Sequence, residues 1–419
     1  MTDFRFLHAA DIHLDSPLHG LARYEGVPVS DVRGATRTAF DTLISTALEQ
    51  EVDFVILAGD VFDGDWKDMG TGLYFARALG RLAAAKIPVF LLHGNHDAAS
   101  VLTKALPLPE NVRVFSSRKP QTFFLEELGV AVHGRSFPTA HVTDNLAQEY
   151  PVPSAGKFNI GVLHTAVAGY THHQPYAPCS VQELVAKGYS YWALGHVHEH
   201  QILHESPWII FPGNLQGRSI RETGAKGAVL VDVADGVVSS VEHIAVDALR
   251  WLRVEVNCDG IERQEDLVTA IRAALTNSYN ESSFGRPAIA RILLKGETSL
   301  QGALQGGAAQ LRDEIRAIAL HVSSDLWVEK ISLETTAPPA SEAAAPGRDD
   351  FAALLAEAIG DADLARALAE DLGPLMAALP DAGEVGEAGI MASALSKDWA
   401  GILAVGASAL RARLTKDAG

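Results

Sequence analysis

Short apolar runs that end in polar residues recur along the first hundred positions of the chain. Three of them cover Phe4 to His8, Phe54 to Leu57 and Pro88 to Leu92. Runs of this length and composition are typical of buried parallel strands. Two longer segments, 31–50 and 71–85, place apolar residues near helical spacing between these runs. The alternation of strands and helices with short connections predicts a parallel sheet that is covered by helices.

A second series of apolar stretches follows and predicts further strands. They lie at 112–115, 122–125, 130–134, 158–164 and 191–195, and further on near 207–211, 227–233 and 237–244. A short helix is predicted at 180–187, and the last three strands would complete a second sheet. We therefore predict an α/β (α+β sandwich) fold for residues 1–246, in which a β-sandwich of two sheets is flanked by helices.

The remainder of the chain divides into three segments. Residues 247–334 alternate strand and helix patterns, which predicts a small α+β domain. Residues 335–349 are rich in Pro and Ala and hold too few large apolar residues to fold, so they predict a flexible linker. Residues 350–419 are rich in Ala and Leu, and their pattern predicts a helical C-terminal region.

Composition is that of an ordinary soluble globular protein, with 47% hydrophobic and 21% charged residues. No stretch has the ~18 uninterrupted apolar residues of a membrane span, and the N-terminus lacks a signal segment. The only cysteines, Cys179 and Cys258, argue against a disulfide framework and favour the cytoplasm. A net charge of −18 argues against nonspecific binding of nucleic acid, unless bound cations reverse the field at the site.

Polar side chains follow the ends of several predicted strands. Because open α/β sheets bind ligands at the carboxyl ends of their strands, we expect these side chains to converge. The candidate metal ligands are Asp11, His13, Asp60, Asn95, His164, His196 and His198. Residues two apart in an extended segment face the same way, so the Asp-x-His pair could reach one ion, as could the His-x-His pair. Carboxylates, imidazoles and an amide suit manganese, iron or zinc, and two such ions would serve phosphoester hydrolysis.

Four more polar residues accompany these candidates. His96 would be free to protonate a leaving alkoxide or to stabilise the transition state. Asp97 could orient a neighbouring imidazole. Asp63 could support the ligands from outside or simply cap the next helix. Arg218 could bind a backbone phosphate or form an ordinary surface ion pair.

The order of these motifs resembles that of the calcineurin-like metallophosphoesterases. The motifs are Asp-x-His at 11–13, Gly-Asp-x-x-Asp at 59–63, Gly-Asn-His-Asp at 94–97, a strand-terminal histidine at 164 and Gly-His-x-His at 195–198. Five motifs in this order are far more specific than any single one.

Finer similarities point to one branch of that superfamily. Residues 8–17 and 59–68 resemble the SbcD/YhaO-type DNA repair exonucleases, and residues 175–179 and 212–218 are similar to the YhaO branch in particular. The resemblance covers the first 245 residues well and the following α+β segment only in general shape.

The resemblance implies roles for the candidate residues. One ion would be held by Asp11, His13, Asp60 and His198. The other would be held by Asp60, Asn95, His164 and His196, with His96 unligated and catalytic. The usual metal of the family is manganese, and its reaction is phosphodiester cleavage in DNA. Residues 247–334 would cap the site, and residues 350–419 would dock on an SMC-like ATPase of the SbcC type. Members of the family commonly form homodimers, so the resemblance also implies a possible homodimer.

Three hypotheses follow. The first is a metal-dependent DNA exonuclease that works with an SMC-like ATPase. The second is a metallophosphoesterase that acts on small nucleotides or phosphoproteins, and the third is a non-catalytic scaffold of the same fold. The additional domain and helical region favour the first hypothesis, because a small soluble substrate does not require them. The complete set of ligands argues against the scaffold.

Overall fold

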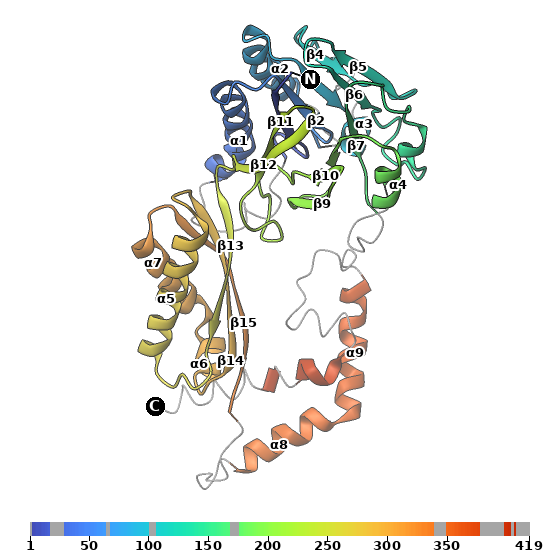
Figure 1. Cartoon of the computed structure of the whole chain (residues 1–419). Helices are drawn as coiled ribbons and strands as arrows, with labels where there is room; N and C mark the ends of the chain where they lie inside the picture. Colours follow the sequence, from blue (N-terminus) through green and yellow to red (C-terminus); the bar gives the residue numbers. More distant parts are fainter. Residues whose placement is uncertain are drawn as a thin grey trace. The chain divides into compact units, whose positions relative to one another are not determined.

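The computed structural model describes residues 2–16, 29–63, 68–99, 106–167, 176–338, 349–377, 398–403 and 406–407. Within these ranges the strands form two six-stranded sheets and one three-stranded sheet (Figure 1). The chain divides into two compact units, residues 1–252 with 281–289, and residues 253–280 with 290–419. Parts of the quoted motifs, at positions 17, 64–67 and 175, lie outside the described residues.

The first sheet carries the N-terminal strands. Its order is β12 (Val237–Ala245), β11 (Gly227–Ala234), β1 (Phe4–Ala9), β2 (Phe54–Ala58), β3 (Val89–Leu92) and β4 (Val112–Val114). The four strands from β1 to β4 are parallel, and β11 is antiparallel to β1. Helices α1 (Val29–Glu49) and α2 (Met69–Ala84) contribute side chains to the apolar layer on one face of this sheet.

The second sheet contains the strands from the middle of the chain. Its order is β5 (Gln121–Leu125), β6 (Val130–Gly134), β7 (Phe158–His164), β8 (Tyr191–Gly195), β10 (Trp208–Phe211) and β9 (Gln201–Glu205). A short 3-10 helix, η2 (Leu146–Glu149), and helix α4 (Val181–Ala186) pack on its outer face.

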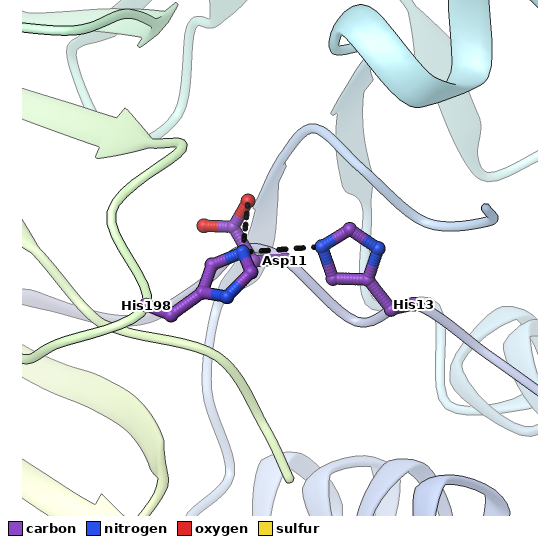
Figure 2. A group of neighbouring side chains, drawn as sticks. All are labelled: Asp11, His13 and His198. Carbon is purple, nitrogen blue, oxygen red and sulfur yellow. Dashed lines mark hydrogen bonds and ion pairs between the residues drawn. The ribbon is translucent and has the colours of Figure 1, made fainter. Parts of the chain in front are cut away.

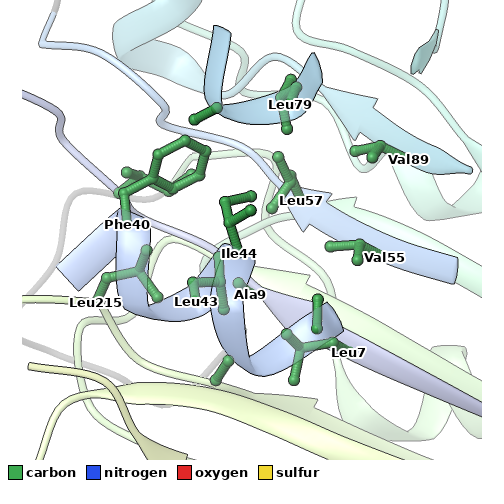
Figure 3. Close-up of a cluster of buried hydrophobic side chains, with 14 of the residues drawn as sticks. Leu7, Ala9, Phe40, Leu43, Ile44, Val55, Leu57, Leu79, Val89 and Leu215 are labelled. Atoms are coloured by element: carbon green, nitrogen blue, oxygen red, sulfur yellow. The ribbon is translucent and has the colours of Figure 1, made fainter. Parts of the chain in front are cut away.

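Successive apolar side chains of a strand point to opposite faces of the sheet and so form a separate apolar layer on each face. In β1, Leu7 and Ala9 join the cluster that includes Phe40 and Leu43 of α1 (Figure 3), whereas Phe6 joins the layer between the two sheets. Successive side chains of a strand point to opposite faces, so one buried strand serves both layers. The predicted arrangement of two packed sheets flanked by helices is confirmed.

One prediction about the second sheet is wrong. The strands predicted at 227–233 and 237–244 belong to the first sheet, where β11 pairs with β1 from Phe4↔Val233 to His8↔Val229. An unpaired β1 would leave a row of backbone donors and acceptors open at an edge, and β11 closes it. The sequence also gave no signal for β9 or for the short helix α3 (Asn95–Ala99).

The second compact unit contains most of a three-stranded sheet and several helices. The order of the sheet is β13 (Arg250–Asn257), β14 (Ala288–Glu297) and β15 (Leu326–Thr336). The helices are α5 (Gln264–Ser282), α6 (Gln301–Gly306), α7 (Ala308–Val322), α8 (Asp349–Gly360) and α9 (Ala362–Ala377). Three of these helices and all three strands overlap the predicted α+β segment.

The predicted linker and C-terminal region are only partly described. Strand β15 extends into the predicted linker as far as Thr336, and positions 339–348 lie outside the described residues. The predicted domain boundaries therefore remain predictions. Among the described helices, none combines the length and apolarity that a membrane crossing requires.

Candidate metal centre

The loops that follow β1 and β2 run side by side and bring the first candidates together. The backbone N–H of Asp11 donates to the carbonyl of Gly59 at 3.0 Å, and that of His13 donates to the carbonyl of Asp60 at 3.0 Å. Asp11 and His13 have positive φ values of 50° and 44°. The two side chains therefore reach the same place through left-handed turns, and not through the extended backbone that we expected.

Each of the two central carboxylates is held by a backbone N–H from another loop. Asp11 accepts from the N–H of His196 at 2.9 Å, and Asp60 accepts from that of His96 at 3.0 Å. The backbone at Gly94 lies so close to Asp60 that an added Cβ atom there would be 2.2 Å from Oδ1 of Asp60. The carboxylates are thus fixed before any ligand arrives.

Asp11, His13 and His198 form a first group of donor atoms, which lie within 4.8 Å of one another (Figure 2). The Nε2 atoms of the two imidazoles are 3.2 Å apart, and Nε2 of His198 is 3.9 Å from Oδ1 of Asp11. The Nδ1 atoms face carboxylates, Asp63 at 2.6 Å from His13 and Glu222 at 2.7 Å from His198. A carboxylate accepts, so each Nδ1 carries the proton and the two Nε2 lone pairs face each other. A cation between them would relieve this repulsion.

Asp60, His164 and His196 form a second group. The Nδ1 of His164 donates to the carbonyl of Ala58 at 3.0 Å, which leaves Nε2 facing Oδ1 of Asn95 at 3.0 Å and Oδ2 of Asp60 at 3.3 Å. Here, too, a nitrogen lone pair meets oxygen acceptors, an arrangement that requires a proton or a metal cation.

The electrostatics of the two groups fit the binding of cations. Burial raises the pKa of Asp11. Burial also opposes the charge of Asp60, but His164 and other imidazoles outweigh it and hold the pKa of Asp60 well below its usual range. Burial disfavours the charged form of His164 as well, yet Asp60 and Asp11 raise its pKa to about 9. Burial and the nearby Arg218 lower the pKa of His13 to about 4. The residues present are therefore suited to two divalent ions.

His196 and His198 lie in different donor groups, contrary to the expectation that they reach one ion together. His196 has a φ of 106°, so the segment is not extended and its alternate residues do not face the same way. The ligand sets that the family resemblance implied also separate these two histidines.

His96 lies beside both groups, with 43% of its side chain exposed. Its Nδ1 is 3.6 Å from Oδ1 of Asp63, and its ring meets that of His13 edge to face at 5.0 Å. His13, Asp63 and His96 also form a third group of potential donor atoms. Asp63 accepts the Nδ1 proton of His13, however, and lies 3.6 Å from Nδ1 of His96, so this carboxylate lies between the two rings and supports the first group.

Asp97 does not orient an imidazole by a hydrogen bond. Its carboxylate accepts the backbone N–H groups of Val61, Phe62 and Gly94 at 2.9–3.1 Å, and the Nδ1 of His93 is 3.9 Å away. It therefore shapes the loops after β2 and β3, which corrects the role that we expected. Burial and the charge of Asp60 raise the pKa of Asp97 to about 7.

Arg218 lies between two carboxylates that hold histidines. Its Nη1 is 3.4 Å from Oδ1 of Asp63, and its Nη2 is 3.7 Å from Oε1 of Glu222. The positive charge of Arg218 therefore faces the carboxylates of Asp63 and Glu222, and only 23% of its side chain is exposed. A contact with phosphate remains a prediction.

Sequence reasoning missed Glu222 and Lys226. Glu222 accepts the Nδ1 proton of His198, and Nζ of Lys226 donates to the backbone carbonyl of His198 at 2.7 Å. Both follow the Gly-rich turn that contains Arg218. A carboxylate four residues after that arginine was the available signal, but nothing in the sequence links it to His198.

Comparisons with known proteins place the chain among metallophosphoesterases. Residues 4–200 match the model of calcineurin-like phosphoesterases, and residues 251–336 match that of the middle domain of metallophosphoesterase YhaO. The chain is 32% identical over 375 residues to YhaO of Bacillus subtilis (strain 168), described as an uncharacterized metallophosphoesterase, with 88% of this chain and 90% of that protein covered.

More distant relatives were also found. A DNA double-strand break repair protein, Mre11 of Sulfurisphaera tokodaii, is 26% identical over 313 residues, which cover 71% of this chain and 75% of that protein. A dimetal phosphatase from Danio rerio superposes with a TM-score of 0.34 at 11% identity and covers 55% of this chain and 93% of that one.

Proposed function

The chain belongs to the YhaO-type metallophosphoesterases, hydrolases of phosphoester bonds, and on this basis we propose that it is a metal-dependent DNA nuclease. The observation that carries the proposal is the presence of two neighbouring donor groups with the exposed imidazole of His96 beside them. Phosphodiester hydrolysis through two metal ions needs these parts.

We propose the ligand sets that the family resemblance implies, and the two donor groups supply three members of each. Asp11, His13, Asp60 and His198 would hold one ion, and Asp60, Asn95, His164 and His196 would hold the other. In this proposal Asp60 is shared by both sets, and its carboxylate lies near imidazoles of both, since His164 and His13 act together to lower its pKa. When bound, two divalent ions supply Lewis-acid polarisation of the phosphoryl oxygens and activation of a water nucleophile at neutral pH. Imidazole and carboxylate ligands suit manganese, which we propose as the metal.

His96 acts as the general acid in this proposal. The Asp63 carboxylate faces Nδ1 of His96, which leaves Nε2 to give a proton to the leaving alkoxide. The backbone N–H of His96 donates to Asp60, so the acid keeps a fixed position relative to the ligand groups. Asp63 also holds His13, and it thus connects the acid to the first donor group.

DNA as the substrate is supported by the relatives named as DNA repair proteins. In the SbcD/YhaO-type nucleases, helices after the cap dock on an SMC-like ATPase, and helices α8 and α9 provide such a segment, with Leu354 60% and Leu364 41% exposed. We propose an ATPase of this kind as partner and the cytoplasm as the site of action, in keeping with two free cysteines. Homodimerisation stays a prediction.

The test is a cleavage assay with linear duplex and single-stranded DNA, in which manganese is titrated with and without a candidate ATPase. We expect cleavage that depends on manganese. Asp60→Asn should abolish it because both ligand sets lose a carboxylate. His96→Gln should lower it by a factor of about 10²–10⁴ because a general acid is removed.

Matched substitutions separate these effects from a loss of structure. Asp144→Asn and His321→Gln make the same chemical changes at exposed positions and should retain full activity. Turnover of an aryl phosphodiester without cleavage of any DNA would overturn the nuclease proposal in favour of a small substrate. Failure to bind manganese, iron or zinc at neutral pH would favour a non-catalytic scaffold.

A further inference from the structure

Glu222 lies in the loop between β10 and β11 and is largely buried, with 15% of its side chain exposed. Its Oε1 accepts from Nδ1 of His198 at 2.7 Å. Its Oε2 accepts from the backbone N–H of Arg218 at 2.6 Å and from Nδ2 of Asn214 at 3.1 Å. We propose that Glu222 is a positioning residue, which keeps the proton of His198 on Nδ1 and thereby sets the affinity of the first donor group for a divalent cation.

The loop is built around this carboxylate. A Cβ atom at Gly217 would lie 2.6 Å from the carbonyl oxygen of Glu222, so the chain approaches itself closely at this turn. The side chain of Asn214 is fully buried, and its Nδ2 donates to the carbonyl of Gln216 as well as to Glu222. Lys226, at the end of the same loop, holds the backbone carbonyl of His198. One loop therefore fixes both the ring and the backbone of this histidine.

The effect of Glu222 is restricted to one of the two donor groups. In the first group both imidazoles give their Nδ1 protons to carboxylates, whereas His164 of the second group gives its proton to a backbone carbonyl. A carboxylate partner makes an imidazole a more basic ligand and fixes its tautomer. A change at Glu222 should therefore weaken the first ion site and leave the second intact. This part rests on the proposed two-metal function.

The substitution Glu222→Gln gives a specific prediction, because one end of the amide must be a donor. Two hydrogen-bond donors, the backbone N–H of Arg218 and Nδ2 of Asn214, meet Oε2. Oε1 accepts one hydrogen bond, from Nδ1 of His198, and has Nη2 of Arg218 at the longer distance of 3.7 Å. The amide oxygen is therefore expected to turn towards the two donors, which places the NH₂ group against Nδ1 of His198. Nδ1 then becomes the acceptor, the proton moves to Nε2, and Nε2 can no longer bind a cation.

The first measurement is the tautomer of His198 in full-length, metal-free protein labelled with ¹⁵N-histidine, with His198→Gln to assign the signal. We expect Nδ1–H in the native chain and Nε2–H in Glu222→Gln. Glu222→Asp keeps a carboxylate and should keep Nδ1–H. Titration of the same proteins with Mn²⁺ should show that Glu222→Gln weakens one of two binding steps by about 10- to 100-fold.

Glu205→Gln is the matched control, since it removes the same charge from an exposed position on β9 and should change neither result. An unchanged tautomer in a folded Glu222→Gln protein would overturn the proposal, as would equal weakening of both binding steps. The tautomer is measured without metal or substrate. A protein that fails to cleave DNA but shows the switch therefore retains the positioning role and loses only the nuclease function.

Discussion

His8 lies on β1 only three residues before Asp11, but its surroundings differ from those of the ligand candidates. Its Nδ1 is 3.0 Å from the hydroxyl of Tyr191, and its Nε2 is 3.1 Å from the carbonyl of Leu194. A neutral imidazole with its proton on Nε2 satisfies both partners. Burial lowers the pKa of His8 to about 3, so this histidine is a structural residue of the layer between the sheets.

The burial of His8 predicts that the free energy of unfolding decreases at acidic pH. The unfolded chain binds a proton at His8 near the ordinary pKa of 6.5, whereas the folded protein resists it until about pH 3. Stability is therefore complete above about pH 6.5, falls as the pH drops towards 3, and levels off below that value. At pH 5 the loss amounts to about 2 kcal/mol for this residue.

Urea unfolding of metal-free protein at pH 7.5 and pH 5 measures this loss. In His8→Gln the amide can still donate to Leu194 but cannot titrate, so the difference between the two pH values should shrink by about the same 2 kcal/mol. An identical difference in the variant and the native chain would refute the assignment.

Individual donor residues could be predicted from the sequence, but their partners could not. Asp60 and His164 end apolar runs, and this pattern marks the carboxyl ends of strands. Glu222 is 24 residues from His198 and meets it only because the loop after β10 folds back. Asp97 looked like a partner for an imidazole because of its place in the chain, but its carboxylate accepts backbone N–H groups instead.

Secondary-structure elements were predicted best where a strand is buried on both faces. Every residue of β2 and of β7 is buried, and such strands appear in the sequence as continuous apolar runs. The pairing of β11 with β1 could not be predicted, because any apolar strand can join either sheet. Strand β9, with its partly exposed side chains, lacks an apolar run altogether.

The end of β8 comes so close to β2 that it permits no side chain at Gly195. A Cβ atom there would lie 2.0 Å from the carbonyl oxygen of Ala58 and 2.9 Å from Nδ1 of His164. Gly195→Ala should therefore lower the free energy of unfolding by about 1–3 kcal/mol, because the strands must separate to accept the methyl group. Urea unfolding measures the change, and weaker binding of manganese should accompany it.

Gly80 is the matched control for this substitution. It lies within α2, and an added Cβ would meet nothing within 4 Å. Gly80→Ala should raise the free energy of unfolding by about 0.5–1 kcal/mol, because alanine is the better helix former. A Gly195→Ala protein as stable as the native chain would show that the two strands can separate without loss.

At the scale of the molecule, the net charge of −18 makes bound cations a source of stability. The carboxylates of Asp11 and Asp60 are buried beside imidazole lone pairs, so metal binding should favour the folded state strongly. At a concentration 100 times the dissociation constant, a ligand stabilises the folded state by about 2.7 kcal/mol.

Thermal unfolding with manganese and with excess EDTA tests this expectation. The metal should raise the melting temperature by about 5–10 °C. Asp60→Asn should lose most of this increase, while Asp144→Asn should keep it. Equal melting temperatures with and without metal in the native chain would contradict the presence of a preformed cation site.

The α+β segment was predicted from its alternating pattern, and β13, β14 and β15 bear out its strands. Its limits were harder to place because the chain passes between the two compact units three times, at 252–253, 280–281 and 289–290. The division into compact units depends on contacts between residues that are far apart in the sequence. The spacing of apolar residues along the chain carries no information about these contacts. The match to the YhaO middle domain begins at residue 251, close to the start of β13.

Asp11, His13, Asp60 and His196 all adopt positive φ, a conformation that is strained by about 1–2 kcal/mol in residues with a side chain. Glycine would relieve that strain at each position and would remove a proposed ligand at the same time. The backbone therefore holds strain at four of the proposed ligands, and glycine at these positions would gain stability at the cost of the proposed ion binding.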